Sequence, residues 1–281
     1  MSVSRYAGNS LATVRLVLLT ACLSLASVGA HAQAQPSKDY EPHVGQEGKD
    51  VVWVPTSQAL VDRMLDIAKV TPGDSVIDLG SGDGRTVITA VKRGARALGI
   101  EYNPDMVELA KRNAQKEGVG DKARFRKADL FETDLSDATV ITMFLLPSIN
   151  LKLRPKLLDL KPGTRIVSNS FTMDDWQSDG TTTAEKDCTS YCTAYLWIVP
   201  AKVDGTWTTP QGEMTLKQEF QNFTGTVKGP NPAVIANGKM RGDQISFTAG
   251  NTRYSGRVTG NKIDGTATAG PNTTAWTATK K

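Results

Sequence analysis

A strand, a glycine-rich turn and a helix follow one another early in the chain, and this arrangement constrains the fold more than any other feature. The segment 76–84 has the sequence VIDLGSGDG, in which Gly80, Gly82 and Gly84 alternate with other residues. Glycine is needed where a chain turns sharply and where its backbone must approach a ligand. The helix that begins near Arg85 offers free N–H groups and a positive dipole end to an anion. The segment therefore predicts a ligand site at the end of a β-strand.

Three acidic residues end predicted strands in the same region. Asp78 lies before the first glycine, where it would repel a pyrophosphate but could hold an ammonium or sulfonium cation. Arg85 stands where the dinucleotide fingerprint G-x-G-x-x-G needs its third glycine. Glu101 can accept hydrogen bonds from ribose hydroxyls, and Asp129 from an adenine amino group with Leu130 against the ring. The pattern favours S-adenosylmethionine over NAD.

Residues 51–200 alternate short apolar strands with helical patterns. This alternation predicts a mostly parallel sheet that is covered by helices on both faces. Asn103 and Pro104 give one helix a cap and a first-turn proline. The predicted strands are 76–79, 97–100, 124–126, 140–144 and 165–167, and the predicted helices are 56–70, 85–93, 104–116 and 148–160.

These motifs resemble those of class I S-adenosylmethionine-dependent methyltransferases. The resemblance is closest to the protein-lysine methyltransferases that act on the mitochondrial ADP/ATP carrier and on the ATP synthase c subunit. It rests on WVPT at 53–56, DLGSGDGR at 78–85, EYN at 101–103 and FLLP at 144–147, and it covers about residues 51–200.

The resemblance implies a Rossmann-like, seven-stranded α/β sheet whose reversed last strand is residues 195–199. It also implies S-adenosylmethionine as the cofactor and a protein lysine as the acceptor, methylated by in-line displacement. In the family, the residues matching Asp78, Gly80 and Gly82 contact the methionine part of the cofactor. The expected cofactor-binding residues are Asp78, Gly80, Gly82, Gly84, Glu101, Asn103, Asp129 and Leu130, and the expected acceptor channel consists of Trp53, Thr56, Phe144 and Pro147.

Composition removes several other chemistries. The chain has 2 histidines and 3 cysteines, which leaves a zinc site or a Ser-His-Asp triad few residues to use. The net charge of +4 shows no strongly basic region, so no nucleic-acid partner is expected. The fourth strand does not end in Asn-Pro-Pro-Tyr or Asp-Pro-Pro-Tyr, which counts against methylation of adenine N6 in DNA. We assign no general base and no metal site.

Residues 1–32 predict an export signal. They contain Arg5 and Arg15 but no acidic residue, and an apolar run too short to prefer spanning a bilayer follows Arg15. The sequence AHA that ends at Ala32 fits a small-residue cleavage site. We therefore expect a periplasmic or secreted protein with no transmembrane span once the signal is removed. A lipoprotein signal ending at Cys22, an uncleaved anchor and a transit peptide are the alternatives.

The predicted export affects both the cysteines and the function. Cys188 and Cys192 would most simply form a disulfide in an oxidising compartment, and two free buried thiols are the alternative. An exported protein would meet little cytosolic S-adenosylmethionine. The second hypothesis is therefore an exported binding or interaction protein that has a methyltransferase fold and no turnover. A dinucleotide oxidoreductase is disfavoured by Asp78 and Arg85.

The segments on either side of the predicted methyltransferase domain differ from it in composition. Residues 33–50 are polar, contain prolines and glycines, and predict a flexible lead-in. Residues 201–281 are rich in Gly, Thr, Asn and Ser, and 238–245 weakly repeats as 256–263. Each copy predicts a strand, a short turn and a strand. We expect an antiparallel meander or small barrel-like sheet that recognises substrate, binds a ligand or joins subunits.

Overall fold

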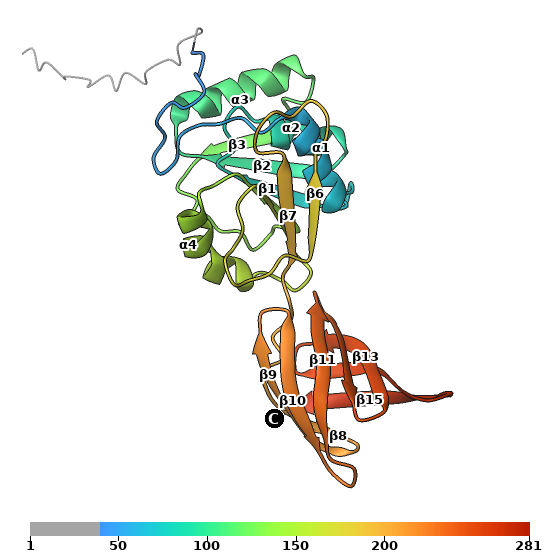
Figure 1. The fold of residues 1–281 in the computed structure, drawn as a ribbon. Helices are drawn as coiled ribbons and strands as arrows, with labels where there is room; N and C mark the ends of the chain where they lie inside the picture. Colours follow the sequence, from blue (N-terminus) through green and yellow to red (C-terminus); the bar gives the residue numbers. More distant parts are fainter. Residues whose placement is uncertain (1–39) are drawn as a thin grey trace, which may run out of the picture. The chain divides into compact units, whose positions relative to one another are not determined.

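The computed structural model describes residues 40–281, which form an α/β sheet domain and a closed β-barrel (Figure 1). The predicted export signal at 1–32 and the first residues of the predicted lead-in, 33–39, lie outside the described residues. In the described part of the chain, every helix is too short or too polar to cross a membrane. The fold class predicted from the sequence is confirmed for both the sheet and the barrel.

The sheet has 7 strands in the order β3-β2-β1-β4-β5-β7-β6. Strands β1 to β5 pair in parallel, whereas β7 is antiparallel to both of its neighbours. The edge strand β6 is absent from the sequence prediction, because its sequence GTTT is short and polar. The strands are β1 (Ser75–Leu79), β2 (Arg96–Glu101), β3 (Ala123–Lys127), β4 (Val140–Met143), β5 (Arg165–Asn169), β6 (Gly180–Thr183) and β7 (Thr193–Ile198).

The helices begin where their capping residues place them. Ser57 accepts a hydrogen bond of 3.2 Å from the Leu60 N–H, so the first helix begins at Gln58 and not at residue 56 as predicted. Asn103 accepts one of 2.9 Å from the Asp105 N–H and caps the third helix as predicted. The helices are α1 (Gln58–Ile67), α2 (Arg85–Lys92), α3 (Pro104–Lys116) and α4 (Pro147–Leu158).

Two apolar cores hold β1 in place. Val76 packs into a core that includes α1 and α2, whereas Ile77 and Leu79 pack into a second core that includes α4. This division follows from the alternation of side chains along a strand. Because β1 is buried on both sides, the turn that follows it starts from a rigid position.

The chain beyond residue 201 forms a closed antiparallel barrel, which confirms the predicted barrel-like sheet. The two repeats are hairpins, β11–β12 and β13–β14, whose turns contain Gly242 (φ 61°) and Gly260 (φ 57°). The interior is filled, since the Phe247 ring stacks on Tyr254 with centroids 4.6 Å apart. The barrel strands are β8 (Gly205–Thr209), β9 (Gly212–Glu219), β10 (Asn222–Lys228), β11 (Ala233–Arg241), β12 (Gln244–Ala249), β13 (Thr252–Thr259), β14 (Lys262–Ala269) and β15 (Asn272–Lys280).

Candidate functional site

The glycine turn joins β1 to α2 and is held by the neighbouring strand. The N–H groups of Gly80 and Ser81 donate to the Ile100 carbonyl over 2.9 and 3.0 Å. Gly82 has a φ of 53°, and a Cβ added there would lie 2.7 Å from Trp53 Nε1. Only glycine combines this backbone conformation with so close a neighbour. Gly84 precedes α2 and packs against Phe125, so it shapes the helix start without lining the cavity.

The side chain of Arg85 braces this turn. Its guanidinium donates to Asp83 Oδ2 over 2.6 Å and to the Thr56 carbonyl over 2.7 Å. The residue that breaks the dinucleotide fingerprint therefore ties the turn to the segment before α1.

Asp78 is a buried carboxyl at the end of β1. Its Oδ1 accepts a hydrogen bond of 2.6 Å from the Thr142 hydroxyl, which β4 contributes. Burial raises the pKa of Asp78 from 3.8 to about 7, and the nearby charge of Glu101 adds to the rise against the opposing hydrogen bond. A cation placed beside this group would stabilise its ionised form.

Glu101 connects the end of β2 to the turn. Its Oε2 accepts a hydrogen bond of 3.0 Å from the Gly82 N–H, and its Oε1 accepts one of 3.0 Å from the Asn103 N–H. A charged acceptor shared by two backbone donors is held in a fixed orientation. Glu101 therefore lines the cavity, and each of its carboxylate oxygens keeps a further lone pair for a ligand hydroxyl.

Asp129 follows β3 and is engaged by a residue from the segment before α1. Its Oδ1 accepts a hydrogen bond of 2.8 Å from the Phe131 N–H, and its Oδ2 forms an ion pair with Lys49 Nζ. The hydrogen bond from Lys49 holds the pKa of Asp129 below its usual range. Lys49 Nζ also lies 4.7 Å from the centroid of the Tyr102 ring.

Residues 40–56 form a segment that covers the ends of these strands, and we call it the strap. The sequence predicted a site role only for Trp53 and Thr56 of this segment. The strap is a folded turn in which Gly45 and Trp53 are joined by a hydrogen bond of 2.9 Å and Glu47 bridges to Val52. Its residues 46–56 line the cavity. The part of the predicted flexible lead-in that the structure describes therefore contributes to the site, a role that its polar composition did not signal.

The strap and the strand ends enclose one cavity with about 1070 Å³ of empty space, part of it open to solvent. Ser81 also faces it, and its hydroxyl is buried without a hydrogen-bond partner in the described part of the chain. Pro147, on the exposed first turn of α4, does not line the cavity. Of the predicted site residues, those that line it are Asp78, Gly80, Gly82, Glu101, Asn103, Asp129, Leu130, Trp53, Thr56 and Phe144.

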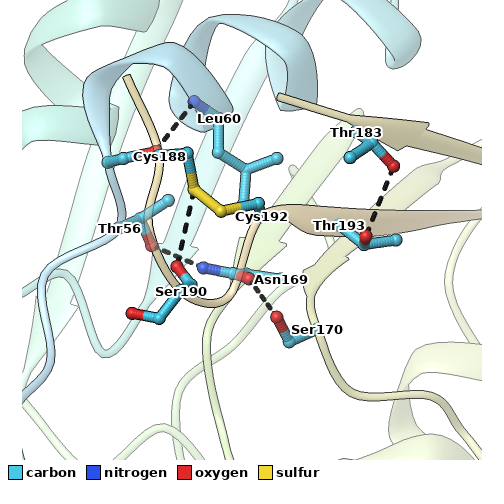
Figure 2. The surroundings of a disulfide bond; sticks show 10 residues. Thr56, Leu60, Asn169, Ser170, Thr183, Cys188, Ser190, Cys192 and Thr193 are labelled. Atoms are coloured by element: carbon cyan, nitrogen blue, oxygen red, sulfur yellow. Dashed lines mark hydrogen bonds between the residues drawn. A yellow bond between two sulfur atoms is a disulfide. The ribbon is translucent and has the colours of Figure 1, made fainter. Parts of the chain in front are cut away.

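A disulfide between Cys188 and Cys192 closes the loop between β6 and β7 (Figure 2). Their Cα atoms lie 5.8 Å apart, and Cys188 packs beside Leu60 at the edge of the α1 core. Among residues 40–281, no three His, Cys, Asp or Glu side chains are grouped so that they could hold a metal ion.

Comparison with known proteins gives consistent matches to this domain. The family model of the ANTKMT methyltransferase domain matches residues 78–180. A protein-lysine N-methyltransferase of Saccharolobus islandicus is 43% identical over 163 residues, which cover 57% of this chain and 96% of that protein. A mouse adenine nucleotide translocase lysine N-methyltransferase is 37% identical over 129 residues, and a human lysine N-methyltransferase of the ATP synthase c subunit is 33% identical over 131. The chain spans about half of these two mammalian relatives, 56% of each.

Solved structures of methyltransferases also resemble this chain. A Salinibacter ruber protein described as an RNA methyltransferase, in complex with S-adenosyl-L-homocysteine, has 50% sequence identity and a TM-score of 0.50. The match covers 53% of this chain and 96% of that protein. The family model ends at residue 180, and the barrel, which begins at Gly205, lies outside it.

Proposed function

Because the chain belongs to the protein-lysine N-methyltransferase family and is an S-adenosylmethionine-dependent methyltransferase, we propose that it methylates the side-chain amine of a lysine in a protein substrate. The observation that carries the proposal is the meeting of Asp78, Glu101 and Asp129 around one cavity. They come from the ends of β1, β2 and β3, which are neighbours in the sheet. Ligands of open α/β sheets bind beyond these carboxyl ends of the strands.

The cavity suits a nucleoside that carries positive charge and no phosphate. Asp78 is a buried carboxylate whose ionisation a cation would favour, and the buried Ser81 hydroxyl has no hydrogen-bond partner in the described chain. Gly82 has no Cβ, which lets the Trp53 ring of the strap pack closely over the backbone of the turn. We propose that Asp78, Gly80 and Gly82 hold the methionine part, Glu101 the ribose and Asp129 the adenine, with Leu130 against the ring.

The residues of this chain act by binding, orienting and excluding water. When bound by these residues, S-adenosylmethionine would supply an electrophilic methyl group on a sulfonium for in-line transfer to a lysine nitrogen. Trp53 in the strap and Phe144, which directly follows β4, both line the cavity. We assign them to its acceptor side, where they limit the access of water. A lysine has an unperturbed pKa of about 10.4, so desolvation between such side chains favours the neutral amine that can react.

Transfer of labelled methyl tests the proposal. The purified full chain is incubated with methyl-labelled S-adenosylmethionine and the soluble or membrane protein fraction of the source cells. We expect label in protein, and methylated lysines after acid hydrolysis. Label confined to small molecules would contradict the proposal. The variant Asp78→Ala serves as a control, because it should lose both cofactor binding and transfer.

RNA methylation is the second candidate, favoured by the description of the Salinibacter ruber protein. The same incubation with total RNA, followed by digestion to nucleosides, separates the two candidates. The prediction of no nucleic-acid partner requires that the nucleosides remain unlabelled while lysine is methylated.

We further propose that the protein is exported. The basic start, apolar run and small-residue site within residues 1–32 support this proposal. N-terminal sequencing of the mature protein after cell fractionation tests it, and a chain that begins at Met1 in the cytosolic fraction would contradict it.

A further inference from the structure

A second cavity adjoins the cofactor cavity beneath the same strap. Both are lined by residues 47–52 together with Phe144 and Leu145. The second cavity extends beyond the first to Phe171 and Tyr191. Because the two cavities adjoin and share these walls, we treat them as one passage from the strand ends toward the loop between β6 and β7.

Three aromatic rings form one wall of this passage, which we call the aromatic wall: Phe144, Phe171 and Tyr191. The ring centroids of Phe144 and Tyr191 lie 5.2 Å apart, and those of Phe171 lie 6.1 Å from Phe144 and 6.2 Å from Tyr191. Phe144 directly follows β4, Phe171 lies two residues after β5, and Tyr191 lies two residues before β7. Tyr191 is 46% exposed although it is a large apolar ring, so its outer face is open to a partner.

Two tight turns hold the outer members of the aromatic wall. Ser170 (φ 60°) precedes Phe171, whose N–H donates to the Asn169 carbonyl over 2.7 Å. Tyr191 itself has a φ of 56°, a conformation that costs about 1 kcal/mol in a residue other than glycine.

The disulfide fixes the second of these turns (Figure 2). Tyr191 is the residue directly before Cys192, and Cys192 is joined to Cys188, which packs at the edge of the α1 core. The Ser170 N–H donates to the Thr193 carbonyl over 2.7 Å and links the two turns. A left-handed conformation between such anchors persists only because the surroundings impose it.

The strap contributes negative charge to the walls of the passage. Glu47 and Asp50 are exposed and line both cavities, whereas the charge of Lys49 is paired with Asp129. A lysine side chain matches this combination, because its methylene stem packs along aromatic faces and its ammonium is attracted by ring faces and by carboxylates.

We infer that the aromatic wall guides the acceptor lysine to the cofactor, that Tyr191 is a specificity-determining residue of this passage, and that the Cys188–Cys192 disulfide is a positioning element for Tyr191. The inference rests on the proposed lysine acceptor. It adds no covalent step to the reaction, because the disulfide acts only by holding the loop.

The test measures acceptor and cofactor affinities separately. Binding of poly-L-lysine is followed by calorimetry in the presence of S-adenosyl-L-homocysteine at raised ionic strength, where unspecific charge attraction is screened. Methylation of the same polymer gives KM and kcat. We expect Tyr191→Ala to weaken poly-L-lysine binding and raise its KM by about tenfold, with the S-adenosyl-L-homocysteine affinity unchanged. Tyr191→Phe, which keeps the ring, should remain close to the unsubstituted enzyme.

Tyr102 provides a matched control for Tyr191. It is 49% exposed and lines only the cofactor cavity. Tyr102→Ala should therefore shift the cofactor affinity and leave poly-L-lysine binding unchanged. Lys186→Ala, at an exposed position of the loop between β6 and β7 and two residues before Cys188, should change neither affinity.

The disulfide is tested through its dependence on Tyr191. The double variant Cys188→Ser/Cys192→Ser should raise the acceptor KM in the same direction as Tyr191→Ala, without a change in cofactor affinity. Tyr191→Ala introduced into that background should cost less than it does alone, because the two changes remove the same contact. Full additivity, or loss of cofactor affinity in the serine variant, would show a merely structural disulfide and overturn this part.

The outcomes separate this inference from the proposed function. Label on RNA nucleosides, or none on lysine, defeats the proposed function before any variant is made. Lysine methylation with an unchanged acceptor KM in Tyr191→Ala, or no saturable binding of poly-L-lysine, overturns the aromatic wall alone.

Discussion

Asp78→Asn should change how the stability of the cofactor-free protein depends on pH. The folded-state pKa of Asp78 is about 7 against an ordinary 3.8, so between these values the folded protein holds a proton that the unfolded chain has lost. The contribution of Asp78 to the free energy of unfolding is therefore fully present below pH 3.8 and is lost as the pH rises through about 7. An asparagine has no such proton, and the variant should lack this loss.

The difference between the pKa values sets the magnitude. A shift from 3.8 to about 7 corresponds to a loss of about 4 kcal/mol in the free energy of unfolding once Asp78 is ionised. About 3 kcal/mol of that loss falls between about pH 5 and about pH 8. The asparagine introduced by the substitution would still accept the hydrogen bond from Thr142. Any amide hydrogen left without an acceptor would cost about 1–3 kcal/mol, but at every pH alike, so it leaves the pH dependence unchanged.

Urea denaturation of both proteins without cofactor, at several pH values, measures this difference. We expect the variant to gain about 3 kcal/mol relative to the unsubstituted protein between about pH 5 and about pH 8. Asp74 serves as a control, because its contribution to stability should depend on pH in the opposite direction: it is lost as the pH falls. Burial raises its pKa, but the hydrogen bond from Thr139, that from Thr71 and the Arg165 guanidinium together hold it below its ordinary value. Parallel pH profiles for Asp78→Asn and the unsubstituted protein would refute the reasoning.

Three further predictions concern cofactor binding, each measured by calorimetry. The affinity for S-adenosylmethionine should rise as the pH increases through about 7, because a cationic ligand favours ionised Asp78. Asp78→Asn should remove this rise. A flat pH profile in the unsubstituted protein would argue against contact between Asp78 and a cation. Gly82→Ala should weaken cofactor binding about tenfold or more and alter tryptophan fluorescence, since the new Cβ would lie 2.7 Å from Trp53 Nε1. An unchanged affinity would exclude close contact between the cofactor and the backbone of this turn. Lys49→Met should strengthen binding up to about threefold by freeing Asp129 for the adenine amino group, whereas weaker binding would show that Lys49 itself contacts the cofactor.

The inner part of the site, meaning the glycine turn and the three acidic residues at the strand ends, could be predicted from local and topological rules. The glycine turn is encoded by adjacent residues, and its left-handed positions need no tertiary information. Asp78, Glu101 and Asp129 could be brought together in advance, because the ends of neighbouring parallel strands meet at one edge of a sheet. The barrel hairpins were predictable for the same local reason, since each repeat carries a glycine at its turn.

The outer part of the site depends on contacts between distant segments, and no local pattern reveals these. Lys49 and Asp129 are 80 positions apart and meet only after the strap folds over the sheet. The polar composition of the strap is equally compatible with a mobile segment. Gly84 shows the converse: it belongs to the glycine pattern, yet its neighbours are Phe125 and Ala110 in the protein interior. A motif thus identifies a turn without deciding which of its glycines face the ligand.

The division between inner and outer parts has a functional consequence. The carboxylates that we assign to the cofactor sit on the rigid strand ends, whereas the groups that we assign to the acceptor sit on the strap and on the loop closed by Cys188 and Cys192. Loops held on a rigid scaffold are where binding specificity commonly resides. Changes in the strap or in Tyr191 can therefore alter acceptor choice while the cofactor site stays intact, so acceptor KM and cofactor affinity should vary independently among variants of the two regions.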